Sequence, residues 1–170
     1  MRRGKNPVKK VIWVLIVVLF LGALDLLPFR SKELADLLPV KTVIITRSGA
    51  EYTVDVGAGV KAVGDTLSEA LKRLQEQTSE DLFLPTAEQV VLTEPADEAA
   101  EAVAEESAFR PAAGICRTPD PAPDPNALGR YLQTHPSDYT IVDLQAAIAE
   151  GREPEIPVIL PVGGGYRFED

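Results

Sequence analysis

Residues 40–56 read VKTVIITRSGAEYTVDV, and this stretch decides the fold. β-branched side chains dominate both of its arms, and Gly49 lies in the four-residue connection RSGA between them. β-branched residues favour strands, and a short loop that contains glycine is typical of an antiparallel hairpin. The stretch therefore predicts a β-hairpin that supplies the first two strands of a sheet.

A helix and a buried strand are predicted after the hairpin. Thr66 and Glu69 match the capping-box pattern Thr-x-x-Glu, in which each side chain satisfies a backbone N–H group at a helix start. The dense apolar run QVVLT at residues 89–93 predicts a buried strand. The helix is expected over residues 66–77, because apolar side chains recur there at helical spacing: Leu67, Ala70, Leu71 and Leu74.

The second half of the chain predicts helices separated by a proline-rich loop. Residues 95–106 have high helix propensity, but their apolar stripe is mostly alanine, which predicts weak packing. Residues 111–125 hold five prolines without apolar periodicity, which is typical of an extended loop or linker. The remaining predictions are helices near 124–132 and 141–151, a proline-flanked edge strand at 156–160 and a glycine turn at 163–165.

The N-terminus predicts a membrane segment. Residues 11–24, VIWVLIVVLFLGAL, carry no charge, and the apolar character extends to residue 27. Their length fits either a short membrane span or the core of a signal peptide. No Ala-x-Ala cleavage pattern follows, which favours an uncleaved anchor over a cleaved signal. Five basic residues precede the segment: Arg2, Arg3, Lys5, Lys9 and Lys10. The positive-inside rule therefore places the N-terminus in the cytoplasm and the chain after the segment outside it.

These elements predict an α+β fold with a small mixed sheet, a β-hairpin and packed helices, preceded by one transmembrane helix. The expected organisation is a basic cytoplasmic tip at 1–10, an anchor at 11–27 and an exported domain at 28–170 with the proline-rich loop at 111–125. The whole chain has a net charge of −9, but removing the tip leaves 12 basic and 26 acidic groups, a net charge of −14. An acidic domain disfavours nucleic acid as a partner, because phosphate binding needs clustered lysine and arginine.

The sequence predicts no catalytic, cofactor-binding or metal-binding residues, and hence no cofactor. His135 lies in a turn-like stretch, where a lone histidine is usually solvated, and Cys116 resembles a chance surface or half-buried cysteine. One cysteine excludes an internal disulfide, and one histidine without a second cysteine excludes the usual zinc sites. Acidic residues cluster at Asp97, Glu98, Glu101, Glu105 and Glu106. Their spacing does not match that of a calcium-binding loop, so they are interpreted as a solvated helix face.

The order of four motifs resembles a known family. Residues 30–37 (RSKELADL), 66–74 (TLSEALKRL), 82–94 (LFLPTAEQVVLTE) and 156–161 (IPVILP) are similar to successive segments in the N-terminal domain of the spore germinant receptor C-subunits, the Ger(x)C lipoproteins. Three features depart from that family: the lipid-bearing cysteine is missing, its usual histidine after Leu84 is replaced by Pro85 and Thr86, and the chain ends where the family continues into further domains.

The resemblance implies a stand-alone, membrane-anchored relative of that domain. We expect a non-enzymatic protein of spore germination or sporulation in the cell or spore inner membrane, with the bilayer and integral membrane or receptor-like proteins as partners. One alternative is an envelope hydrolase or ligand-binding module unrelated to germination, with a pocket near His135 or Tyr166. A generic membrane-anchored structural protein is the third interpretation.

Overall fold

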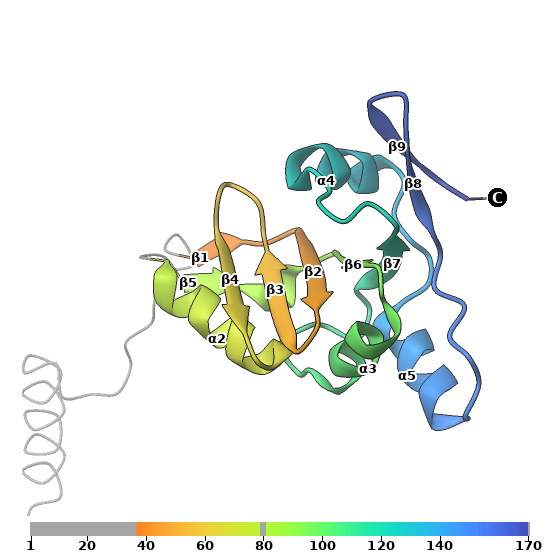
Figure 1. Cartoon of the computed structure of the whole chain (residues 1–170), viewed down its shortest axis with the longest axis horizontal. Helices are drawn as coiled ribbons and strands as arrows, with labels where there is room; N and C mark the ends of the chain where they lie inside the picture. Colours follow the sequence, from red (N-terminus) through yellow and green to blue (C-terminus); the bar gives the residue numbers. More distant parts are fainter. Residues whose placement is uncertain (1–36, 79–80, 170) are drawn as a thin grey trace, which may run out of the picture. The chain divides into compact units, whose positions relative to one another are not determined.

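The computed structural model describes residues 37–78 and 81–169 (Figure 1). The predicted basic tip, the predicted anchor at 11–27 and all but the last residue of the motif at 30–37 lie outside these residues. Among the helices within 37–78 and 81–169, none has the length and apolar character needed to cross a membrane.

A five-stranded mixed sheet forms the centre of the domain, with the strand order β4-β3-β2-β6-β7. β2 pairs antiparallel with β3, and β3 pairs antiparallel with β4, whereas β6 and β7 continue the sheet in parallel with β2. The predicted hairpin is therefore confirmed, with Ser48 facing Glu51 across a two-residue turn. The strands are β2 (Thr42–Ser48), β3 (Glu51–Asp55), β4 (Lys61–Gly64), β6 (Gln89–Thr93) and β7 (Gly114–Thr118).

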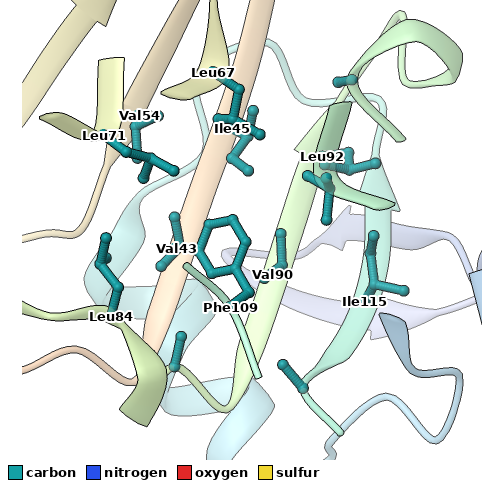
Figure 2. Close-up of a cluster of buried hydrophobic side chains, with 14 of the residues drawn as sticks. Val43, Ile45, Val54, Leu67, Leu71, Leu84, Val90, Leu92, Phe109 and Ile115 are labelled. Atoms are coloured by element: carbon teal, nitrogen blue, oxygen red, sulfur yellow. The ribbon is translucent and has the colours of Figure 1, made fainter. Parts of the chain in front are cut away.

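Both faces of the sheet are covered. α2 (Leu67–Gln77), α3 (Asp97–Glu105) and α5 (Ile141–Ala149) pack on one face, where Val43, Val54 and Leu92 join the main core. α4 (Pro125–Thr134) and the hairpin of β8 (Ile159–Val162) and β9 (Gly165–Phe168) cover a smaller core on the other face. β6 is buried at every position, as expected for a parallel strand that lies between two layers. Figure 2 shows the main core, in which Phe109 from the segment after α3 joins the strand side chains.

Side-chain caps fix the starts of three helices. The Thr66 hydroxyl accepts a hydrogen bond from the Glu69 N–H group, as the sequence predicts, but the Glu69 carboxylate accepts from Asp65 rather than from Thr66. α5 has a complete capping box between Thr140 and Asp143. Asp124 caps α4 through the N–H group of Asn126. These bonds satisfy donors that a helix start otherwise leaves without partners.

The structure corrects two predictions for the second half of the chain. The segment 111–125, predicted as a loop, contains β7, which is almost entirely buried and pairs with β6. α3 packs closely rather than weakly, because its alanine face, with Val103, is fully buried against the sheet. Alanine allows this close approach since it adds little bulk between the helix and the strands.

Three smaller features differ from the predictions or were missing from them. β4 was not predicted, and neither was the short parallel pair of β1 (Leu37–Pro39) with β5 (Asp81–Phe83). The predicted strand at 156–160 begins later, as β8, and its partner β9 follows the predicted glycine turn. Gly163 and Gly164 adopt positive φ angles of 57° and 86°, which glycine reaches without steric cost.

Candidate functional site

A concave surface lies between α3 and α5, and we call it the α3–α5 groove. Two neighbouring cavities of about 350 and 400 Å³ form it, and both are lined by Glu101 and Ile148. The first cavity reaches the sheet at Arg117, and the second runs between the two helices along Ala104 and Gln145. The lining of the groove therefore combines apolar and charged side chains.

Arg117 is held firmly at the sheet end of the groove. Its backbone lies opposite Leu92 in the β6–β7 register, and its N–H group donates to the Pro157 carbonyl at 2.9 Å on the other side of β7. Alternation along β7 turns the Arg117 side chain toward α3 and α5, on the same face as Ile115. Both neighbours of β7 thus hold the backbone from which the guanidinium extends.

The Arg117 guanidinium is incompletely paired. Its Nη1 atom lies 3.6 Å from the Glu94 carboxylate, which is beyond ordinary hydrogen-bond distance. Its Nε atom is buried and has no hydrogen-bond partner among the described residues. A buried donor without a partner costs on the order of 1–3 kcal/mol. The Arg117 guanidinium is therefore paired only weakly with Glu94, and its unpaired Nε atom is buried within the fold.

Helix ends supply further polar groups near the first cavity. α3 begins at Ala96, which no described side chain caps, and the Ala96 N–H group donates to Glu94 over 3.3 Å. α5 ends at the opposite side, where Gly151 adopts a φ of 66° and Arg152 follows. The hydrogen bond from Arg152 to Glu150, 2.6 Å long, raises the pKa of the Arg152 guanidinium. The start of α3 carries partial positive charge, which favours anions.

His135 and Tyr166, the residues named for the alternative interpretation, lie away from this groove, on the face that α4 covers. The exposed His135 ring stacks on Tyr131 with ring centroids 4.7 Å apart, and the Tyr166 hydroxyl accepts a hydrogen bond from Asp124. The Tyr131 hydroxyl in turn accepts from the Phe168 N–H group. These contacts attach the β8–β9 hairpin to α4, which is a packing role.

Cys116 is fully buried, not at the surface or half-buried as predicted. Strand alternation places it on the opposite face from Arg117, beneath α4, in the smaller core with Ile44 and Leu128. Burial raises the pKa of the Cys116 thiol to about 12. The thiol is therefore protonated at neutral pH and shielded from reagents.

The acidic run of α3 divides between two surroundings. Glu98 forms an ion pair with Arg47 of β2, whereas Glu101 and Glu105 line the α3–α5 groove. Glu106 accepts a hydrogen bond from Ala108, and the side chain of Asp97 falls outside the described ones. Within the described residues, no group of three or more possible metal ligands comes together.

No local pattern in the sequence indicates the Arg117 end of the groove. Arg117 and Arg152 are isolated arginines 35 positions apart, and their meeting depends on β7, inside a segment predicted as a loop. No family model, curated protein or solved structure matches the chain. The resemblance to the germinant receptor C-subunits stays a prediction.

Proposed function

We propose that this chain is a non-enzymatic, membrane-anchored protein of spore germination or sporulation that acts through protein contacts of its α+β domain. The order of the motifs supports the family part of this proposal. The TLSEALKRL motif spans the cap and first two turns of α2, and residues 82–94 run through β5 into β6. The IPVILP motif leads into β8. The similar segments thus fall on the structural framework of one domain.

The α3–α5 groove is the observation that carries the protein-contact role. Ile148 is 39% exposed at the groove, and Val142 is 49% exposed on the same helix. Val142, Gln145 and Ala149 share one face of α5 at i, i+3 and i+7 spacing. Large apolar side chains exposed beside charged ones are typical of protein interaction sites. We infer that an integral membrane partner binds along this groove.

The N-terminus supports the membrane placement within this proposal. The five basic residues before the uncharged run at 11–24 favour a cytoplasmic N-terminus and a domain on the outer side. Cysteine labelling tests this orientation, because the buried Cys116 gives little background. A Gln133→Cys variant, exposed on α4, is expected to react with a membrane-impermeant maleimide in intact cells, and the unsubstituted chain is not. Reaction of the variant only after lysis would contradict the orientation.

Deletion of the gene in a spore-forming host tests the biological role. We expect slower germination or fewer spores, restored by the unsubstituted gene. An Ile148→Asp variant should fail to restore the phenotype while accumulating normally, because a carboxylate placed in the groove weakens an apolar contact. Gln133→Asp, on the opposite face of the sheet, is the matched control and should restore it. Normal germination and sporulation in the deletion strain would refute the proposal.

A further inference from the structure

We propose that the first cavity of the α3–α5 groove binds a small monocarboxylate with a branched apolar body. The cavity lies beside the carboxyl ends of the parallel strands β6 and β7, where Glu94 follows β6 and Arg117 is the penultimate residue of β7. Ligands of open sheets with parallel strands commonly bind at these ends, where side chains from different strands and helix starts converge.

The positive groups of the cavity suit a carboxylate. Arg117 offers a planar guanidinium whose paired carboxylate, that of Glu94, lies 3.6 Å away, and Arg152, which pairs with Glu150 at 2.6 Å, lines the same cavity. The start of α3, where the Ala96 N–H group donates to Glu94, adds partial positive charge. Glu94 already lies between Arg117 and Ala96, but its contacts of 3.6 and 3.3 Å are long. Glu94 therefore pairs only weakly with Arg117 and with the start of α3.

The apolar and acidic side chains that line the cavity indicate what the rest of the ligand is like. Apolar side chains form the wall that would contact an uncharged body, and the volume of about 350 Å³ is at the small end of ligand cavities. Glu101 and Glu153 also line the cavity and would repel a second negative charge, which disfavours dicarboxylates and phosphates. The apolar lining consists of Ala96, Ala100, Ile148, Pro154 and Ile156.

Two sources share this chemistry: a free acid and the C-terminal leucine-like residue of a peptide. Calorimetric titration of the full-length chain in a non-ionic detergent separates them. The probes are 4-methylpentanoate, its alcohol 4-methylpentanol, its amine counterpart isopentylamine, and the peptide Gly-Gly-Leu with a free or amidated C-terminus. We expect the acid to bind at least about tenfold more tightly than the alcohol and the amine, because only the acid pairs with a guanidinium. Preference for the free-ended peptide over the acid would identify the peptide as the source.

Substitutions at Arg117 and at Arg130 test whether the carboxylate binds in the first cavity. Arg117→Met should weaken binding of the preferred carboxylate probe at least about tenfold, and Arg117→Lys should weaken it less, because lysine keeps the charge but loses the planar donor pair. Arg130→Met, on α4 across the sheet, is the control and should change binding less than about twofold. Because the acid and the alcohol are compared on the unsubstituted chain, the test holds even where a variant folds poorly.

Two results would overturn the inference. One is equal or undetectable binding of 4-methylpentanoate and 4-methylpentanol together with no preference for the free-ended peptide. The other is a folded Arg117→Met variant that binds the preferred probe as tightly as the unsubstituted chain. The inference is independent of the proposed role in germination, since it is measured on purified protein and a deletion phenotype does not affect it.

Discussion

Gly64 of β4 lies so close to Ala70 of α2 that a Cβ atom on Gly64 would stand 2.5 Å from the Ala70 backbone nitrogen. Real Cβ atoms essentially never approach another atom so closely, and the obstacle is helix backbone rather than a flexible side chain. The missing side chain of Gly64 therefore sets how closely α2 approaches β4. The contact also explains why glycine ends this edge strand.

Gly64→Ala should lower the free energy of unfolding by about 1–3 kcal/mol, because the first turn of α2 must move away from β4. Gly165→Ala is the matched control, since its Cβ would lie 3.8 Å from the nearest atom, the Val162 carbonyl oxygen. Denaturant titration followed by circular dichroism measures both. Equal stability of the two variants would show that α2 can shift without cost.

Leu144→Ala should cost about 2–5 kcal/mol of stability, because Leu144 is fully buried between α5 and the sheet and its truncation leaves a cavity. Val142→Ala, on the exposed side of the same helix, should cost less than about 1 kcal/mol. The same titration compares them. A small loss for Leu144→Ala would mean that α5 contributes little to the core.

Thr140→Ala should remove the capping box of α5 and cost about 1 kcal/mol. The Thr140 hydroxyl and backbone hydrogen bonds hold the pKa of the Asp143 carboxyl below its usual value. Thr140→Asn keeps a capping side chain and should retain most of the stability. Nuclear magnetic resonance of Asp143 should show its carboxyl pKa rising toward the ordinary value in Thr140→Ala, and an unchanged pKa would contradict the assigned cause.

Cys116 should not react with a thiol reagent in the folded chain at pH 8, and should react fully in denaturant, because its thiol is buried and protonated. Burial raises the thiol pKa from 9.0 to about 12, so the unfolded chain loses this proton at lower pH than the folded chain. The associated stability is complete below pH 9 and falls as the pH rises toward 12.

A Cys116→Ala comparison isolates this effect from other groups that titrate at high pH. Between pH 8 and pH 10.5, the unsubstituted chain should lose about 2 kcal/mol more stability than the alanine variant. Both measurements need a reductant, which prevents oxidation of the thiol in the unfolded chain. Parallel pH profiles for the two proteins would show that the folded thiol ionises normally.

The local patterns predicted the elements whose signals are contained in a few neighbouring residues. The hairpin at 40–56, α2 with its Thr66 cap and the buried strand at 89–93 are confirmed for this reason. β7 escaped prediction because only residues 114–118 between the prolines are strand, and a run this short shows no clear alternation. Its place in the sheet comes from pairing with β6, which lies more than 20 residues away.

The packing of α3 and the groove could not be predicted for a related reason. An alanine stripe indicates only a narrow helix face, and whether that face packs depends on the surface opposite it. Here α5 and β2 supply that surface. Arg117 and Arg152 come together only through the tertiary fold, so neither residue carries a local motif.

The parallel pairing of β2 with β6 has a consequence for how the chain folds. Ile44 faces Val91 across this pair, so the centre of the sheet closes only after the 46 residues between them have been made and folded back. Until then, the hairpin of β2 and β3 presents the unpaired edge of β2, whose β-branched sequence readily pairs with other chains. If chain synthesis stalls between β3 and β6, the partly folded chain therefore keeps this strand edge exposed and is prone to aggregate unless chaperones bind it.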